Sequence, residues 1–247
     1  VNVPKSSLEY VTTGGTTGIP MAFYQEAVNN HIEWAFILNQ WSRVDFKIGD
    51  KRAVLRCDII KTSEREKHYE YDPLYHAMKF SSYHMTDENL HTFVDKIHKF
   101  RPDFLHVIPS TITVLANYMR ENNIRPFESL KAVLVGGENI FPWQHKLWED
   151  AFQRRIFSWY GHSEMAVLAG ECEVSKRYHL FPQYGFTEII DHNGNRITED
   201  GEEGEIVATG FLNHAMPFIR YRTGDRGVYS SAGCSCGRHY PMMEKVS

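Results

Sequence analysis

Thr12-Thr13-Gly14-Gly15-Thr16-Thr17-Gly18-Ile19-Pro20, residues 12–20, combines three glycines with four threonine hydroxyls. Glycine allows close backbone approach and positive φ, and threonine hydroxyls donate further hydrogen bonds, so this composition is typical of a loop that surrounds phosphate oxygens. The Walker pattern is absent because Ile19 stands where that pattern has lysine, and Gly-x-Gly-x-x-Gly is absent too. For the loop taken alone, the alternative is a polar glycine turn between strands at residues 8–11 and 21–24.

Outward from this loop, short apolar segments alternate with amphipathic ones for about two thirds of the chain. The apolar segments predict buried strands at 53–56, 104–108, 131–135 and 156–159. The amphipathic segments predict helices at 26–41, 87–100 and 111–121, and a further helix that Pro142 opens. Residues 61–72 are rich in charge and predict a loop. This alternation predicts an α/β fold with a mixed, largely parallel sheet and flanking helices that cover both faces.

After about residue 170 the pattern changes to strands joined by turns. Strands are predicted at 186–191, 204–209, 218–221 and 227–229, with an Asn193-Gly194 turn between the first two. We therefore expect an α/β nucleotide-binding part over residues 1–170 and a small β subdomain over residues 171–247.

Three later segments, in this order, add to the threonine-glycine loop: KAVLVGGEN at 131–139, WYGHSE at 159–164 and PFIRYRTGD at 217–225. Together with the loop they resemble the adenylate-forming superfamily of acyl-CoA synthetases, luciferases and peptide-synthetase adenylation domains. The resemblance is closest to the phenylacetate-CoA ligase, coenzyme F390 synthetase and CapK group, because of YGHSE, the RYRTGD segment and CSCGR at 234–238. It covers nearly the whole chain, and residues 80–123 support it less specifically.

The resemblance implies attack of a substrate carboxylate on the α-phosphate of ATP, with release of pyrophosphate and formation of an acyl-adenylate. Transfer of the acyl group to coenzyme A or another acceptor would follow. The loop residues implied to hold the β- and γ-phosphates are Thr13, Gly14, Gly15, Thr16, Thr17 and Gly18, with Thr16 and Thr17 counted as catalytic. Met21 replaces the lysine that the superfamily usually has after the loop proline.

The same resemblance assigns nucleotide contacts to the later segments. The Gly136-Gly137-Glu138 turn would lie against the adenine, and the Tyr160 ring offers a flat face for the base, with Gly161 and Ser163 in the same segment. Glu164 would be a catalytic ligand of Mg²⁺, which prefers oxygen ligands. Asp225 would accept hydrogen bonds from the ribose hydroxyls. The alternatives are core packing for Tyr160, a solvated surface carboxylate for Glu164 and a turn cap for Asp225.

Three of the four cysteines lie in the predicted β subdomain, with a histidine near them. Cys172, His179, Cys234 and Cys236 make up a Cys₃His set, which is common in structural zinc sites and leaves no open coordination position for catalysis. Three unremarkable thiols in a reduced cytosolic protein are the alternative. Cys57 has no evident connection to the set.

The composition limits the classes of binding partner that can be expected. With 27 basic and 31 acidic residues the net charge is -4, so no polyanion-binding surface is indicated and nucleic acid is not expected as a partner. No apolar run approaches the ~20 residues that span a bilayer, and the first residues, VNVPKSS, do not form a signal peptide, so we expect no membrane partner and a cytoplasmic location.

The chain begins with Val, and no lysine-bearing C-terminal lid domain, which the superfamily carries, is evident before Ser247. We therefore expect a large-domain fragment of an AMP-forming acid ligase. The alternative function is a nucleotide-binding or interaction module that lacks complete catalysis.

Overall fold

The computed structural model describes residues 3–13, 20–57, 60 and 67–246. The chain forms two compact units: an α/β unit, Val44–Ser158, and a β-rich unit made of Val1–Arg43 and Trp159–Ser247. The boundary expected at residue 170 falls inside the β-rich unit, within a strand. The threonine-glycine residues Gly14, Gly15, Thr16, Thr17 and Gly18 lie outside the described residues.

The α/β unit contains a mixed, largely parallel sheet, which confirms the predicted fold class. Its strands run in the order β4-β5-β3-β6-β7-β8, parallel except for the β4 and β5 pair. The strands are β3 (Arg52–Leu55), β4 (Tyr69–Asp72), β5 (Ala77–Phe80), β6 (Phe104–Val107), β7 (Ala132–Val135) and β8 (Arg155–Gly161). Only residues 155–158 of β8 belong to this unit, and they pair with β7.

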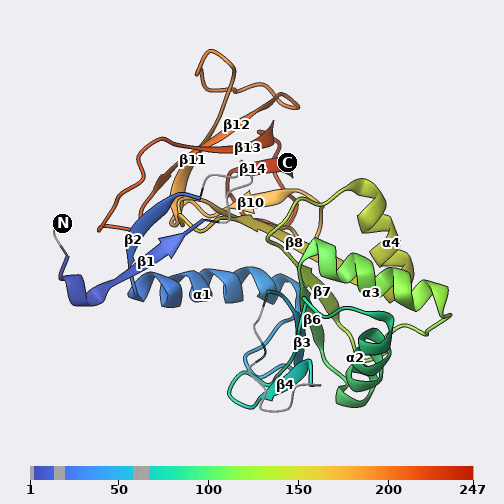
Figure 1. Cartoon of the computed structure of the whole chain (residues 1–247). Helices are drawn as coiled ribbons and strands as arrows, with labels where there is room; N and C mark the ends of the chain where they lie inside the picture. The colour runs from blue at the N-terminus through green and yellow to red at the C-terminus, as the bar shows by residue number, and fades with distance from the viewer. Residues whose placement is uncertain (1–2, 14–19, 58–59, 61–66, 247) are drawn as a thin grey trace. The chain divides into compact units, whose positions relative to one another are not determined.

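Three helices pack on this sheet: α2 (Asp87–Phe100), α3 (Pro109–Glu121) and α4 (Pro142–Phe152). Alternate strand residues such as Leu55, Val107 and Val135 share one core cluster with residues of all three helices, so the helices cover the same sheet face (Figure 1). Val54 and Leu134, whose side chains point to the opposite face, are also buried. Such strands are near-continuous apolar runs, as expected for parallel strands shielded on both faces.

Local signals explain where these helices begin and end. The Thr86 hydroxyl accepts a hydrogen bond from the Asn89 amide at the start of α2, and Arg101 ends α2 with a left-handed backbone (φ 52°). The helix predicted from residue 111 begins two residues earlier, because Pro109 suits the first helical position, where its missing N–H is not needed. The predicted loop over 61–72 is wrong at its end: Tyr69–Asp72 is strand β4.

The β-rich unit contains an antiparallel sheet in the order β8-β9-β10-β14-β13-β12-β11, in which residues 159–161 of β8 pair with β9. Its further strands are β9 (Leu168–Glu171), β10 (Tyr178–Leu180), β11 (Gly185–Ile190), β12 (Glu203–Gly210), β13 (Tyr221–Ser230) and β14 (Met242–Val246). An antiparallel pair of β1 (Leu8–Thr12) and β2 (Ala22–Glu26), helix α1 (Val28–Trp41) and the short 3₁₀ helices η1 (Lys5–Ser7) and η2 (Ser42–Val44) complete it. The strands predicted on either side of the threonine-glycine loop are therefore confirmed.

Strand β13 is one element where two strands were expected, at 218–221 and 227–229. It carries a bulge: Val207 of β12 pairs with Arg222 and Glu205 pairs with Arg226, so Ile206 alone lies opposite residues 223–225. Gly224 has φ 78°, a conformation that glycine adopts without strain and that the bulge requires. Gly224 therefore permits one strand to continue where two were expected.

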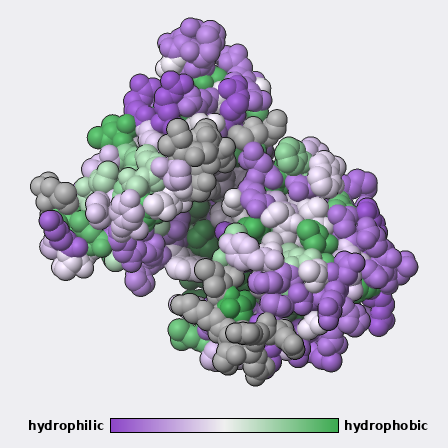
Figure 2. Space-filling model, viewed as in Figure 1, coloured by the Kyte–Doolittle hydropathy of each residue, from purple (hydrophilic) through white to green (hydrophobic). Residues whose placement is uncertain are grey.

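In the part of the chain that the structure describes, no helix has the length and apolarity that a bilayer crossing requires. The face seen in Figure 2 is mostly hydrophilic, with apolar residues in small groups.

Candidate functional site

Two segments far apart in sequence meet in the β-rich unit. The end of β8 and the residues after it carry Tyr160-Gly161-His162-Ser163-Glu164, and β13 carries Tyr221 to Asp225. The Tyr160 hydroxyl donates to Asp225 Oδ2 (2.7 Å), and the Tyr221 hydroxyl donates to Glu164 Oε1 (2.6 Å). The structure therefore brings together Tyr160, Glu164 and Asp225, which the sequence placed in one site.

Glu164 is a buried carboxylate with 7% of its surface exposed. His162 Nδ1 lies 2.9 Å from Glu164 Oε2, and because an ionised carboxylate only accepts, this nitrogen carries the hydrogen. Burial alone would raise the pKa of Glu164, but the hydrogen bonds from His162 and Tyr221 outweigh it and lower the pKa below its ordinary value. An ionised carboxylate supplies the oxygen ligands that Mg²⁺ prefers. The alternative of a solvated surface carboxylate does not fit the burial of Glu164.

The Tyr160 side of the site depends on the β13 bulge. The Asp225 amide donates to the Thr223 hydroxyl (3.1 Å), which itself donates to the Ile206 carbonyl (2.8 Å), so the bulge is closed by its own hydrogen bonds. Burial and the Asp225 carboxylate raise the pKa of Tyr160, so its hydroxyl stays protonated and donates. Asp225 Oδ1 remains on the same carboxylate as a second acceptor.

His162 and Tyr221 are functional candidates that the sequence did not single out. Each donates to one oxygen of Glu164, and Tyr221 does so across 57 residues of sequence. The available signal was the position of His162 within YGHSE, two residues before the carboxylate, and the alternation that places Tyr221 with Thr223 and Asp225 along β13.

Further residues assigned to the site from the sequence have contacts of their own in the described chain. Gly161 pairs with Leu168 of β9, and a Cβ on it would lie 3.0 Å from the Leu168 side chain, so the strand crossing leaves little room there. Ser163 is exposed. Thr13 closes the β1 and β2 pair, since its amide donates to the Met21 carbonyl and its hydroxyl accepts from the Met21 amide, both at 2.9 Å.

In the α/β unit, the Gly136-Gly137-Glu138 turn follows β7 at the carboxyl edge of the parallel strands, where ligands of such sheets usually bind. Gly137 has φ 98°, and a Cβ there would lie 3.2 Å from Arg56 Nη2, so only glycine fits without strain. Glu138 accepts from the Ser110 amide (2.7 Å) and hydroxyl (2.8 Å). These contacts fix the turn against the first turn of α3.

Arg56 and His106 lie at the same edge. Arg56 Nη1 donates to His106 Nε2 (3.0 Å), because a guanidinium has no acceptor, so the imidazole is neutral. Burial, with the guanidinium groups of Arg56 and Arg52, holds the pKa of His106 well below its ordinary value.

The Cys₃His residues converge in the β-rich unit. The ligand atoms of Cys172, His179, Cys234 and Cys236 all lie within 4.8 Å of one another. Cys172 directly follows β9, His179 lies in β10, and Cys234 and Cys236 lie in the segment between β13 and β14. The Cys172 and Cys234 sulfurs are 3.5 Å apart, and Cys236 Sγ is 3.4 Å from His179 Nε2. His179 is fully buried, and burial with nearby arginines lowers its pKa to about 4, so the imidazole is neutral at pH 7. Cys57 is exposed in the other unit.

Two backbone amides also point at the sulfurs of this cluster. The amide of Val174 donates to Cys172 Sγ (3.3 Å) and the amide of Arg238 donates to Cys236 Sγ (3.5 Å). In each case the donor lies two residues after the cysteine. Each of these two amides uses a cysteine sulfur as its acceptor.

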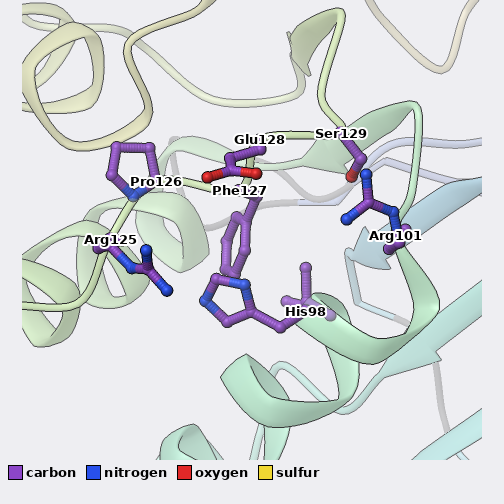
Figure 3. A pocket seen from close by; sticks show the side chains of 8 residues that line it. His98, Arg101, Arg125, Pro126, Phe127, Glu128 and Ser129 are labelled. Atoms are coloured by element: carbon purple, nitrogen blue, oxygen red, sulfur yellow. The ribbon is translucent and has the colours of Figure 1, made fainter.

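A separate pocket of about 190 Å³ opens on the α/β unit between the end of α2 and the segment before β7. Both segments precede parallel strands, so the pocket is at the amino edge of the sheet, away from the Gly136-Gly137 turn. Figure 3 shows Arg101 and Arg125 on two sides of the pocket with the Glu128 carboxylate between them. Its charges are mixed and solvated, and it contains none of the motif residues.

Comparison with known proteins agrees with this arrangement. Residues 10–215 match the AMP-binding enzyme family. Protein CapK of Staphylococcus aureus is 27% identical over 228 residues, which are 90% of this chain and 48% of CapK. Phenylacetate-coenzyme A ligase of Pseudomonas putida is 29% identical over 223 residues, 86% of this chain and 48% of the ligase. The chain therefore spans about half the length of these relatives.

Solved structures show the same fold. An open conformation of 2-hydroxyisobutyryl-CoA ligase, in complex with 2-HIB-AMP and CoA, superimposes with a TM-score of 0.74 at 20% identity, covering 98% of this chain and 57% of that one. ATP-bound MatB from Rhodopseudomonas palustris gives a TM-score of 0.62 at 14% identity, over 95% of this chain and 46% of MatB. With the family match extending over most of its residues, the chain belongs to the AMP-binding enzyme family.

Proposed function

We propose that this chain carries the nucleotide site of an adenylate-forming ligase, which activates a carboxylic acid with ATP. An oxygen of the acid attacks the α-phosphorus, the bond from that phosphorus to the bridging oxygen of pyrophosphate breaks, and an acyl-adenylate forms. The observation that carries the proposal is the pair of hydrogen-bonded carboxylates, Glu164 held by His162 and Tyr221, and Asp225 held by Tyr160. Positioning and charge neutralisation dominate such a reaction.

Glu164 is the residue proposed to hold Mg²⁺. Each of its oxygens accepts one protein hydrogen bond and keeps a further lone pair. The two donors therefore orient the carboxylate and still leave lone pairs that can bind the metal. When bound, the ion neutralises charge on the phosphate oxygens. His162 and Tyr221 keep the carboxylate ionised and fixed in direction.

The other roles are proposals on the same basis. Asp225 accepts from the ribose diol through Oδ1 while Tyr160 holds Oδ2, and the Tyr160 ring lies beside the base. The Gly136-Gly137 turn, fixed by Glu138, admits the adenine closely. The phosphates are proposed to bind to Thr13 and to residues that lie outside the described part of the chain: Gly14, Gly15, Thr16, Thr17 and Gly18.

For the acid we propose an arylacetic acid, on the strength of the phenylacetate-coenzyme A ligases among the relatives, and coenzyme A as the acyl acceptor. Coenzyme A is also present in the 2-hydroxyisobutyryl-CoA ligase structure. Pyrophosphate exchange with arylacetic, fatty and amino acids tests the proposal that the substrate is an arylacetic acid. Exchange that depends on a fatty or amino acid, with none for arylacetic acids, contradicts it.

A second candidate is nucleotide binding without complete catalysis by this chain alone, and it rests on the coverage of about half of each relative. Catalysis requires water exclusion and added charge at the α-phosphate, whereas binding uses local groups. We expect this chain to bind ATP and to exchange pyrophosphate orders of magnitude more slowly than a longer chain. Equal exchange rates in the two proteins contradict this expectation.

We also propose a structural zinc ion held by Cys172, His179, Cys234 and Cys236. Tetrahedral zinc with sulfur at ~2.3 Å separates two sulfurs by about 3.8 Å, close to the 3.5 Å between Cys172 and Cys234. Four protein ligands leave no open position, so the ion has no catalytic step. Free thiols persist in a reducing compartment, which supports the cytoplasm as the location.

Elemental analysis of the untagged protein tests the zinc proposal. One zinc per chain is expected, and Cys234→Ser is expected to lose most of it. Cys57→Ser is the matched control, since this exposed cysteine is outside the cluster. Metal-free protein, or a C234S protein with a full zinc complement, overturns the proposal.

A further inference from the structure

We propose that Arg43 is the buried counter-cation of the metal-bound Cys₃His cluster, and that the cluster is therefore built for a divalent ion. This inference rests on the proposed zinc site. It assigns a role in metal retention to a residue that is not itself a ligand and that lies more than a hundred residues before every residue of the cluster.

Contacts place Arg43 beside the cluster. It lies in η2 at the end of α1, and its Nη1 donates to the carbonyls of Gly170 (2.8 Å) and Glu171 (2.9 Å). Glu171 directly precedes Cys172, and Gly170 pairs with His179 across β9 and β10. The guanidinium therefore bonds the two residues of β9 that lie next to two of the ligands.

The charge of Arg43 faces an aromatic ring and backbone carbonyls, not a carboxylate: its guanidinium carbon lies 5.2 Å from the centroid of the Phe181 ring. The side chain is 8% exposed, and its Nε and Nη2 atoms are buried with no hydrogen-bond partner in the described chain. Among the described residues no carboxylate forms an ion pair with it, because the nearby Glu173 is engaged by Arg238 through both oxygens, at 2.6 and 2.7 Å. Burial lowers the pKa of Arg43 to about 10, so the group is still charged at neutral pH.

A buried charge without a counter-charge is strongly destabilising, so an anion close to Arg43 stabilises the fold. Three thiolates, a neutral imidazole and a divalent ion sum to a charge of -1, which matches one guanidinium. Three protonated thiols would supply no charge, and three thiolates without a metal would supply -3. A metal-free cluster reaches -1 with one thiolate beside two protonated thiols, whereas the cluster loaded with a divalent ion reaches it with all three sulfurs ionised, the form in which cysteine binds a metal.

The experiment measures zinc affinity by competition with a chromophoric chelator in Arg43→Gln and Arg43→Lys proteins. R43Q removes the charge and keeps an amide donor for the Gly170 carbonyl, and it is expected to weaken zinc binding by about tenfold or more, the range seen when groups outside the ligand shell are removed. R43K keeps the charge and is expected to stay within about threefold of the wild type. Arg52→Gln is the control, since Arg52 is an equally buried arginine in the other unit.

The outcomes separate the two proposals. A wild-type protein that binds no zinc refutes the zinc site itself. A wild-type protein that binds zinc, with R43Q within twofold of it, refutes the role of Arg43 alone. If R43Q does not fold, R43K decides: zinc affinity near the wild-type value supports the charge argument, and a tenfold or larger loss overturns it, because the guanidinium hydrogen bonds would then be the cause.

Discussion

Replacing Glu164 with glutamine removes one charge from the site with almost no change in volume. The wild-type carboxylate accepts hydrogen bonds from Tyr221 (2.6 Å) and from His162 (2.9 Å). In E164Q the amide oxygen still accepts from one donor, but the amide nitrogen faces the other donor. We therefore expect both a loss of stability and a loss of the magnesium-dependent part of ATP binding.

The magnitudes follow from burial. A hydrogen bond to a charged group contributes about 1.5–3 kcal/mol to stability. E164Q loses one of the two hydrogen bonds, and the acceptor of the remaining one is no longer charged. The free energy of unfolding is therefore expected to fall by roughly 1.5–3 kcal/mol. Unit charges ~4 Å apart interact by about 4 kcal/mol at an effective dielectric constant near 20, and Glu164 is only 7% exposed. The gain in ATP affinity on adding Mg²⁺ is therefore expected to fall by about tenfold or more, equivalent to ~1.4 kcal/mol.

Calorimetric titration of ATP with and without Mg²⁺ measures this gain in the wild type, in E164Q and in Glu203→Gln. Glu203 is the matched control, because it is an exposed glutamate of the same unit in an ion pair with Arg226, and such pairs contribute about 0–1 kcal/mol. E203Q is expected to keep the full gain. The reasoning is refuted if E164Q keeps the same gain as the wild type, since Glu164 then has no part in holding the metal.

Three further changes test other parts of the site. His162→Asn keeps a donor near the Nδ1 position, so its gain in ATP affinity on adding Mg²⁺ is expected to stay within about threefold of the wild-type gain. His162→Phe removes the donor to Glu164, and its gain is expected to be about tenfold lower. Equal losses in both variants show that packing, not the hydrogen bond, is the cause. Asp225→Asn is expected to weaken ATP binding by about 1–3 kcal/mol. In calorimetry it is also expected to remove the preference for ATP over 2′,3′-dideoxy-ATP. If the preference is retained, another group binds the ribose hydroxyls. The pKa of His106 in the folded state is below 6.5, so the unfolded chain binds one more proton at low pH. The free energy of unfolding therefore falls as the pH drops below 6.5, by at most ~1.4 kcal/mol per pH unit. Urea titrations at pH 7 and 5 should show a smaller fall for His106→Gln, which keeps an acceptor and does not titrate, and an equal fall in the two proteins removes His106 as the cause.

The sequence predicted the α/β unit well because its signals are local. The helix at 87–100 has its apolar residues on one face and a threonine before it, and the structure ends it at the same residues. Short apolar strands such as 104–108 were right to within a residue. Strands β4, β5, β9, β10 and β14 were missed, because their three to five residues pair with partners that are set by the tertiary fold.

The site was predictable in its parts and not in its contacts. Tyr160, Glu164 and Asp225 could be named from their motifs, but the hydrogen bond from Tyr221 to Glu164 depends on where β13 lies relative to β8. The role proposed for Arg43 could not be predicted from the sequence. A lone arginine after a helix is usually solvated, and only the burial of its guanidinium against the Gly170 and Glu171 carbonyls sets it apart.

The bulge in β13 inserts two residues, not one, and this parity constrains how the segment can vary in length. One β12 residue lies between Val207 and Glu205, and three β13 residues lie between their partners Arg222 and Arg226, so inner and outer positions stay in phase on both sides. A deletion of one residue moves all later side chains of β13 to the opposite face and disrupts the sheet. A deletion of two is expected to restore a plain ladder, which keeps the fold and removes Asp225, the carboxylate proposed for the ribose, together with its turn. We therefore expect the segment to accept insertions and deletions in even numbers only, and a two-residue deletion to give a folded protein without the proposed ribose contact.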